Sequence, residues 1–264
     1  MMYEILEHII EFKRDEIAVT KKLVSLGALA EISYKLGRRD FVSALRRNLK
    51  FGTPAIIAEI KKASPFTDLV RPDYYPKEIA LSYQFGGAVC LSVVTDEQFC
   101  QGCPQDIIDV RHSADLPVLR KDFIVDLYQV YESSAIGADC ILLNPALLDD
   151  VQLNEFESLA NDLCMAVLVE VQTPQELERA LHMKTPLIGL NNRNLTTLKA
   201  SIETTLRICD QVPDDRIVVS EAGITTPNDV SRLREAGINS FLVGDDLMRA
   251  EFPGWELEKL FFKA

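Results

Sequence analysis

Residues 166–191, AVLVEVQTPQELERALHMKTPLIGLN, contain a complete strand–helix–strand unit. Apolar runs rich in valine, leucine and isoleucine occupy 166–171 and 187–191. Between them a helical pattern begins at Thr173-Pro174, with proline at the first helical position. A helix of this length between two strands predicts a parallel pair, because parallel strands need a crossover connection of about a dozen residues or more.

The same alternation repeats from residue 54 to the end of the chain. Strands are expected at 54–61, 88–94, 117–121, 140–144, 166–171, 187–191, 217–220 and 240–243, and helices at 76–85, 104–112, 127–136, 149–163, 173–181, 201–212, 226–236 and 254–262. Eight such units predict an α/β fold of the (β/α)8 (TIM) barrel type. An open doubly wound sheet is the alternative. No Gly-x-Gly-x-x-Gly follows the first strand, which disfavours the dinucleotide-binding form of that alternative.

Residues 1–50 precede the first expected strand and are helical in pattern. Ile5, Ile9 and Phe12 recur at helical spacing, which a solvated tail would hardly need. We therefore expect a helical extension packed on the barrel, either as an extra helix or as a cap over one mouth. No linker or low-complexity segment interrupts the chain, so residues 1–264 are interpreted as a single barrel domain.

Composition narrows the class of protein. The net charge of −12 disfavours a nucleic-acid-binding protein, because contacts to phosphates need a basic face. A small anionic ligand stays possible, since a few well-placed lysines suffice to bind it. The six cysteines lie partly within apolar segments, which predicts free thiols in a reducing compartment. No signal peptide and no apolar run of membrane-spanning length is seen, so we expect a cytoplasmic protein without membrane contact.

Polar and charged side chains stand at the ends of five expected strands. They are Glu59, Lys61, Lys121, Glu170, Asn191, Arg193 and Glu221. The carboxyl ends of barrel strands form the active-site mouth. Side-chain alternation places Glu59 and Lys61 on one face of their strand and Ile60 on the other. A single charged strand end is usually only a solvated rim, but five that converge on one mouth indicate acid–base chemistry on a small substrate.

Glu170 is the most informative of these residues. It lies within an apolar strand, between Val169 and Val171. A carboxylate in such surroundings requires a partner, because an unpaired buried charge costs several kcal/mol or more. The lysines at the opposite strand ends are the expected partners.

Glycines follow the two expected strands at 217–220 and 240–243. The sequences are Ala222-Gly223 and Gly244-Asp245, each followed by a helical pattern. Barrel phosphate sites commonly use these two loops, where backbone N–H groups and a helix N-terminus meet the anion. A glycine after a strand is also an ordinary turn residue, so the residues alone leave a phosphate site and two simple turns as equal alternatives.

Metal and redox chemistry have little support in the sequence. His8, His112 and His182 are scattered over expected helices and are interpreted as surface residues. Cys100 and Cys103 have the spacing of a zinc knuckle or a redox pair. No second Cys or His pair follows at metal-binding spacing, and the strand pattern is not that of a thioredoxin. We expect no metal.

In chain order, these motifs resemble the indole-3-glycerol phosphate synthase family. The matching segments are 57–65 (IAEIKKASP), 119–123 (LRKDF), 168–171 (LVEV), 188–195 (IGLNNRNL), 220–224 (SEAGI) and 241–244 (FLVG). The resemblance implies a ribulose-phosphate-binding barrel and a carboxy-lyase of tryptophan biosynthesis. Its members close the pyrrole ring of 1-(2-carboxyphenylamino)-1-deoxyribulose 5-phosphate with loss of carbon dioxide and water.

The resemblance also implies a role for each site residue. The catalytic set is Glu59, Lys61, Lys121, Glu170 and Asn191, and the substrate-binding set is Ser64, Phe123, Arg193, Glu221, Ala222, Gly223, Gly244 and Asp245. Lys121 would be the general acid of ring closure. Lys61 would hold the substrate carboxylate and act as the acid of dehydration, with Glu59 as its base. The implied ligand is a small anionic phosphorylated substrate, without metal or organic cofactor, and other enzymes of the tryptophan pathway are implied as partners.

The chain departs from the family pattern at four places. They are the first loop at Phe66-Thr67-Asp68, the pair Cys100 and Cys103, the strand-7 end at Ala222, and the strand-8 loop at Asp245-Asp246. Ala222 replaces a serine whose hydroxyl would meet the phosphate, and Asp246 puts an acid beside the proposed anion site. Two hypotheses follow. The chain is an active lyase with the family reaction, or it is a diverged paralogue with an altered substrate or a binding role.

Overall fold

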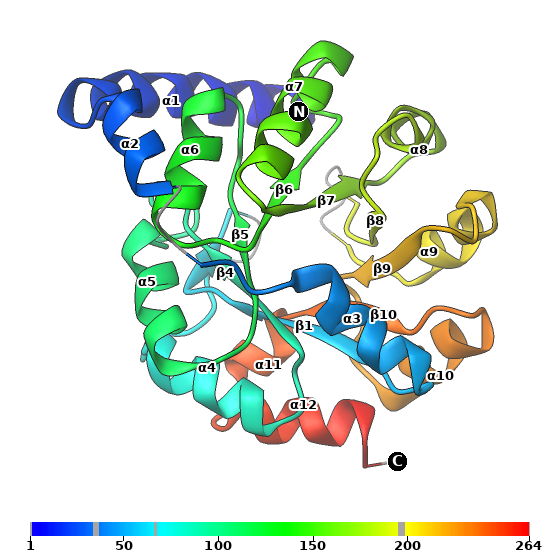
Figure 1. Ribbon diagram of the computed structural model, residues 1–264. Helices are drawn as coiled ribbons and strands as arrows, with labels where there is room; N and C mark the ends of the chain where they lie inside the picture. The colour runs from blue at the N-terminus through cyan, green and yellow to red at the C-terminus, as the bar shows by residue number, and fades with distance from the viewer. Residues whose placement is uncertain (1, 34–36, 66–67, 195–198, 264) are drawn as a thin grey trace.

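A computed structural model describes residues 2–33, 37–65, 68–194 and 199–263, and shows a closed barrel of parallel strands (Figure 1). The strands are β1 (Ala55–Ile60), β4 (Cys90–Val94), β5 (Val118–Lys121), β6 (Cys140–Leu143), β7 (Ala166–Val171), β8 (Leu187–Asn191), β9 (Ile217–Glu221) and β10 (Ser240–Val243). Each pairs with its neighbours in chain order, and β10 pairs with β1 to close the ring. The predicted barrel is confirmed and the open sheet is excluded.

The outer helices follow the strands as the alternation predicts. They are α4 (Pro76–Phe85), α5 (Pro104–Ser113), α6 (Leu127–Ala135), α7 (Asp150–Asp162), α8 (Pro174–Leu181), α9 (Glu203–Ile208), α10 (Pro227–Glu235) and α12 (Pro253–Phe261). Side chains cap several of them. Thr173 accepts a hydrogen bond from the backbone N–H of Glu176, and Thr226 accepts one from that of Asp229. No described helix is both long and apolar enough to cross a membrane.

Three short elements lie between the expected ones. A two-stranded hairpin, β2 (Ala63–Ser64) with β3 (Asp68–Leu69), follows β1, and the helix α11 (Asp245–Arg249) follows β10. The helix expected at 201–212 ends early, because α9 tightens into a 3-10 turn at Cys209–Gln211. These additions sit at the ends of strands, so they affect the mouth of the barrel rather than its wall.

The alternation of β1 divides its side chains between two cores. Ile56, Ala58 and Ile60 pack in the layer between the barrel and its helices, whereas Ile57 faces the barrel interior. Glu59 and Lys61 continue the inward face and reach the mouth, where both line a cavity. The predicted separation of these two residues from Ile60 is therefore confirmed.

Residues 2–33 and 37–50 contain three helices that contact opposite ends of the barrel (Figure 1). Phe41 and Leu45 of α3 (Phe41–Lys50) pack into the interior core that contains Ile57, below the mouth. The other two, α1 (Met2–Leu23) and α2 (Leu26–Ser33), lie against α6. In α1, Phe12 meets Phe99 edge-to-face in the loop after β4, with ring centroids 5.7 Å apart. The extension thus reaches the active-site mouth as well as the barrel's outer wall.

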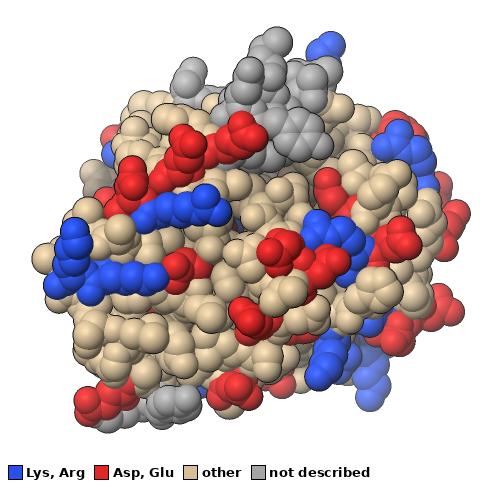
Figure 2. Space-filling view, turned by 90° about the horizontal axis from the view of Figure 1, so that it is seen from above, with Lys and Arg blue, Asp and Glu red and all other residues tan. Residues whose placement is uncertain are grey.

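The outer surface mixes the two signs of charge. On the face shown in Figure 2, acidic and basic side chains lie next to each other with neutral surface between them. Ion pairs join the two signs of charge at the surface of the protein, among them Lys21 with Asp126 at 2.8 Å and Arg232 with Glu203 at 2.6 Å. These pairs neutralise positive charge locally.

Candidate active site

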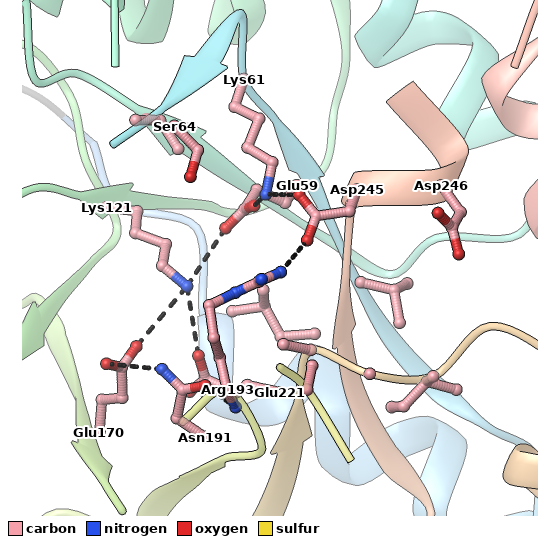
Figure 3. Close-up of a pocket in the computed structure, with 18 of the residues that line it drawn as sticks. Glu59, Lys61, Ser64, Lys121, Glu170, Asn191, Arg193, Glu221, Asp245 and Asp246 are labelled. Carbon is pink, nitrogen blue, oxygen red and sulfur yellow. Dashed lines mark hydrogen bonds and ion pairs between the residues drawn. The ribbon is translucent and has the colours of Figure 1, made fainter. Parts of the chain in front are cut away.

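A cavity of about 590 Å³ opens at the carboxyl ends of the strands. Most of the polar side chains expected at the mouth line it: Glu59 from β1 and Lys61 directly after it, Lys121 from β5, Glu170 from β7, Asn191 from β8 and Glu221 from β9 (Figure 3). Each comes from a different strand except the β1 pair. The parallel barrel brings them together because all of its strands end at the same rim.

Lys121 lies among three acidic side chains. Its Nζ is 3.2 Å from Glu59 Oε2, 3.3 Å from Glu221 Oε2 and 3.6 Å from Glu170 Oε2. Burial favours the neutral amine, but these acidic neighbours, with Glu59 the largest contributor, outweigh it and hold the pKa of Lys121 well above its ordinary value. The ammonium therefore keeps its proton until a substrate oxygen accepts it. The partner expected for Glu170 is present.

Glu59 bridges the two lysines of the site. Its Oε1 lies 2.5 Å from Lys61 Nζ, and its Oε2 lies 3.2 Å from Lys121 Nζ. Burial alone would raise the pKa of Glu59, but Lys121 and Lys61 lower it to about 2. Glu59 is thus a carboxylate at neutral pH. One of its oxygens contacts the Lys61 ammonium and the other contacts the Lys121 ammonium.

Asp245 and Arg193 complete the cluster on the other side of Lys61. Asp245 Oδ1 lies 2.5 Å from Lys61 Nζ, and Arg193 donates to the second oxygen of Asp245. Arg193 Nη2 and Lys61 Nζ therefore share one carboxylate, as Figure 3 shows. The structure places Asp245 against these two cations.

The cluster has more acids than bases. Its acidic members are Glu59, Glu170, Glu221 and Asp245, and its cations are Lys61, Lys121 and Arg193. Burial raises the pKa of Glu221 to about 8, with the charge of Glu170 adding to the effect and Lys121 opposing it. This shift favours the protonated form of Glu221 at neutral pH.

Small residues make room for this packing. A Cβ at Gly189 of β8 would lie 2.0 Å from Glu221 Oε1, so glycine is needed for the Glu221 side chain to fit. Likewise, a Cβ at Gly244 would lie 2.7 Å from the Cβ of Glu59. Gly244 therefore lets the loop after β10 approach β1 closely, which brings Asp245 to Lys61.

The loops after β9 and β10 form the other end of the cavity. Ala222, Gly223, Gly244 and Asp246 all line it. Ala222 and Gly223 have positive φ angles of 60° and 69°, a left-handed pair that turns the chain sharply away from β9. The carboxylate of Asp246 lies 3.4 Å from Arg249 Nη1 and is half-exposed, on the far side of Asp245 from the lysines (Figure 3).

Two further expected residues, Ser64 and Phe123, also line the cavity. Ser64 belongs to the β2–β3 hairpin, and Phe123 follows β5 two residues after Lys121. The departures at Phe66 and Thr67 lie outside the described residues. Cys100 and Cys103 are free thiols, of which Cys100 is buried and faces the cavity.

Asn144 is a site residue that the sequence reasoning missed. It follows β6, and its Nδ2 donates to Glu170 Oε1 at 3.4 Å, beside Asn191 Nδ2 at 3.1 Å from the same oxygen. The signal was available, because Asn144 is a polar residue at a strand end like the others. Within the described residues, no group of three or more potential ligand side chains could hold a metal ion, and all three histidines are exposed.

Together these features define a class of protein. A closed (β/α)8 barrel whose mouth holds two lysines, interleaved carboxylates and glycine loops after its last two strands is an acid–base enzyme for a small anionic substrate. Comparison with known proteins identifies the family. The family model for indole-3-glycerol phosphate synthase matches residues 6–260, and the chain belongs to this family.

Relatives from several bacteria are similar to this chain over its full length. The indole-3-glycerol phosphate synthase of Polaromonas naphthalenivorans is 54% identical over 98% of this chain and 99% of its own. That of Burkholderia multivorans is 51% identical over 99% of this chain and 100% of its own. Among solved structures, the tryptophan synthase α subunit of Legionella pneumophila shares the fold, with a TM-score of 0.61 at 12% identity over 86% of this chain and 100% of its own.

The family assignment settles the activity. The protein is a carboxy-lyase with indole-3-glycerol phosphate synthase activity in tryptophan biosynthesis, and its substrate is phosphorylated. Of the two functional hypotheses, the active lyase is confirmed.

Proposed function

We propose that Lys121 is the general acid of ring closure. The aromatic carbon that bears the substrate carboxylate attacks the ribulose carbonyl, and the carbonyl oxygen gains negative charge as the bond forms. Lys121 Nζ is an ammonium of the cavity lining and lies within 3.6 Å of acidic side chains from β1, β7 and β9. It donates its proton to that oxygen, and loss of carbon dioxide then restores the aromatic ring. The placement of this ammonium in the cavity lining, among acids from three strands, carries the proposal.

In the same proposal, Lys61 and Glu59 act as an acid–base pair. Lys61 holds the substrate carboxylate during ring closure. After carbon dioxide has left, Lys61 protonates the departing hydroxyl and Glu59 accepts the proton released in the dehydration. The 2.5 Å contact between Lys61 Nζ and Glu59 Oε1 supports this division of roles. When Lys61 turns to the substrate, Glu59 loses a neighbouring positive charge, which raises its pKa and makes it a better base.

Other residues orient the reacting groups. Glu170 receives hydrogen bonds from Asn144 and Asn191 on one oxygen and faces Lys121 with the other, so its position is fixed from three strands. We assign Glu170 and Asn191 to positioning Lys121 and the substrate hydroxyls. Phe123 is assigned to packing on the anthranilate ring, since it borders the cavity beside Lys121.

The phosphate is assigned to the loops after β9 and β10. Gly223 and Gly244 would offer backbone N–H groups to the anion, and Ser64 would add its hydroxyl from the facing hairpin. The position of Gly223 and Gly244 in the cavity lining supports this assignment, since the two glycines leave the backbone accessible at that end of the cavity. A fluorescence assay for indole-3-glycerol phosphate formation tests the reaction as a whole.

Ala222→Ser tests the phosphate assignment. The added hydroxyl would give the anion one more hydrogen bond, and a bond to a charged group contributes about 1.5–3 kcal/mol. We expect binding of substrate or inorganic phosphate to tighten by roughly three- to a hundredfold, with turnover within a few-fold. Titration calorimetry with phosphate measures the effect.

Asp246→Ser is the matched comparison for that test. The Asp246 carboxylate already lies toward Arg249, so its removal should change phosphate affinity only modestly. If Ala222→Ser has no effect while Asp246→Ser strengthens binding many-fold, the carboxylate faces the anion and the phosphate assignment is wrong.

The proton on Glu221 predicts a pH dependence. As pH rises through about 8, Glu221 ionises, and the new charge beside Lys121 makes that ammonium a weaker acid. Turnover should therefore fall above about pH 8, and this fall should move to higher pH in Glu221→Gln, which cannot ionise. A pH profile of kcat for both proteins measures this, and identical profiles would refute it.

Unfolding measurements provide an independent check on Glu221. Its folded pKa lies above the ordinary value of 4.5, so the folded state binds the proton more tightly than the unfolded state. The stabilisation is fully present below about pH 4.5 and is lost as pH rises through about 8. The free energy of unfolding should decline over this window in the wild type relative to Glu221→Gln.

Two finer predictions concern the setting of the enzyme. We propose that it is cytoplasmic and that it docks with other enzymes of tryptophan biosynthesis. The free cysteines support the proposed location, because free thiols are typical of a reducing compartment.

The exposed rings of Phe85, Phe252 and Trp255 support the proposed docking. They border a groove between α4 and α12 and form an apolar surface.

A further inference from the structure

Lys13 of α1 is a buried cation outside the cavity. Its side chain is only 2% exposed, although lysine is almost never buried without a partner. The ammonium lies 2.9 Å from Asp96 Oδ2, 3.1 Å from Asp122 Oδ1 and 2.9 Å from Glu16 Oε2. Burial favours the neutral amine, but the charges of Asp122 and Asp96 outweigh it and raise the pKa of Lys13. Lys13 is therefore charged.

The two aspartates stand at the ends of neighbouring strands that form the cavity wall. Asp96 lies two residues after β4, and its Oδ1 accepts hydrogen bonds from the backbone N–H of Phe99 at 2.7 Å and of Cys100 at 3.0 Å. This carboxylate thereby fixes the loop that carries Cys100 into the cavity. The other oxygen of Asp96, Oδ2, forms an ion pair with Lys13. Lys13 therefore stabilises the carboxylate that holds this loop.

Asp122 directly follows Lys121. Its Oδ1 accepts from the backbone N–H of Phe123 at 2.8 Å, and its Oδ2 accepts from Thr95 Oγ1 at 2.5 Å and Arg120 Nη2 at 3.0 Å. Burial opposes its charge, but Arg120 and Lys13 lower the pKa of Asp122 to about 2. Asp122 lies between Lys121 and Phe123 in the chain, and its carboxylate forms an ion pair with Lys13 of the N-terminal helix α1.

We propose that Lys13 is a positioning residue for the reaction. By binding Asp96 and Asp122 at once, its ammonium holds the ends of β4 and β5 together and fixes Lys121 and Phe123 in their reactive geometry. Lys13 touches neither cavity nor substrate, so it acts only through these aspartates. A displacement of about 1 Å in a catalytic group costs up to about a hundredfold in rate. The inference rests on the proposed role of Lys121.

A purely structural salt bridge is the competing explanation. It predicts that losing Lys13 lowers the folded fraction but leaves each folded molecule fully active. A positioning role predicts slower chemistry in the folded enzyme. The phosphate end of the cavity distinguishes the two as well, because it is built by the loops after β9 and β10, which Lys13 does not contact.

The test replaces Lys13 with methionine, which keeps the length of the side chain and removes its charge. We expect kcat per folded molecule to fall about ten- to a hundredfold, with the dissociation constant of inorganic phosphate unchanged. Lys21→Met is the matched control on the same helix. Its ion pair with Asp126 is exposed, so kcat should stay at the wild-type value.

Lys13→Met alone leaves Asp96 buried without its cation and is at risk of not folding. The double variant Lys13→Met/Asp96→Asn removes that charge while the amide oxygen still accepts from Phe99 and Cys100. We expect it to fold and to keep the loss in kcat. A kcat within about twofold of wild type in either folded variant, or an equal loss of phosphate affinity, overturns the proposal.

A final arm separates this inference from the proposed function. Adding Lys13→Met to Lys121→Ala should cost clearly less than Lys13→Met costs in the wild type, because one of the two residues that Lys13 positions is already gone. A full further loss would show that Lys13 acts independently of Lys121 and would overturn the inference alone. Normal turnover in Lys121→Ala itself would instead overturn the role of Lys121.

Discussion

Replacing Lys121 with alanine is expected to lower turnover by at least about a hundredfold, the usual contribution of a positioned general acid. The structure explains why no neighbour can replace it. The groups around its ammonium are the acidic side chains Glu59, Glu170 and Glu221, and the other lysine, Lys61, is paired with Glu59 and Asp245. The measurement is kcat by indole fluorescence, on protein whose folding has been verified.

Lys121→Arg should fail as well. A guanidinium stays protonated at all accessible pH values and cannot release a proton to the carbonyl oxygen. Lys77→Ala is a suitable control, because Lys77 is exposed and pairs only loosely with Asp109 at 3.5 Å. Near-normal turnover of folded Lys121→Ala, with Lys77→Ala also normal, would exclude Lys121 as the acid.

Glu59→Gln is expected to stop the reaction after ring closure. The amide keeps the shape of the carboxylate but cannot accept the proton that dehydration releases. It also removes the charge from between Lys61 and Lys121, whose ammonium groups both contact Glu59. The loss in overall turnover should again be about a hundredfold or more.

Single-turnover experiments with Glu59→Gln locate the block. They should show release of carbon dioxide without formation of indole-3-glycerol phosphate, so that a decarboxylated, still hydroxylated intermediate accumulates. Substrate affinity should change little by comparison. A large rise in the dissociation constant, with bound substrate turning over at the normal rate, would assign Glu59 to binding.

Local patterns were sufficient to predict the barrel. The expected strands at 166–171, 187–191 and 240–243 coincide with β7, β8 and β10. The other strand ends differ by a residue or two, which is where the hydrophobic pattern is weakest because strands begin and end in loops. A period of two in the strands and a helical period between them already require a parallel sheet with helices outside.

The membership of the site could also be predicted, because a barrel brings all strand ends to one rim. Glu59, Lys61, Lys121 and Glu170 were placed together from the sequence, and the structure joins them through direct contacts. Asn144 was missed because asparagine after an apolar run is also an ordinary turn residue. Only its hydrogen bond to Glu170 distinguishes the two.

The sequence by itself therefore determined the fold, the family and the residues at the mouth, because each follows from short-range periodicity or from motifs along the chain. Only the tertiary structure decided the partners: Glu221 against Lys121, Asp245 between Lys61 and Arg193, and Lys13 between the ends of β4 and β5. Charge and burial are properties of the three-dimensional neighbourhood. Contacts such as those of Glu221 with Lys121 and of Asp245 with Lys61 depend on which strand ends meet across the barrel, and local sequence patterns do not contain that information.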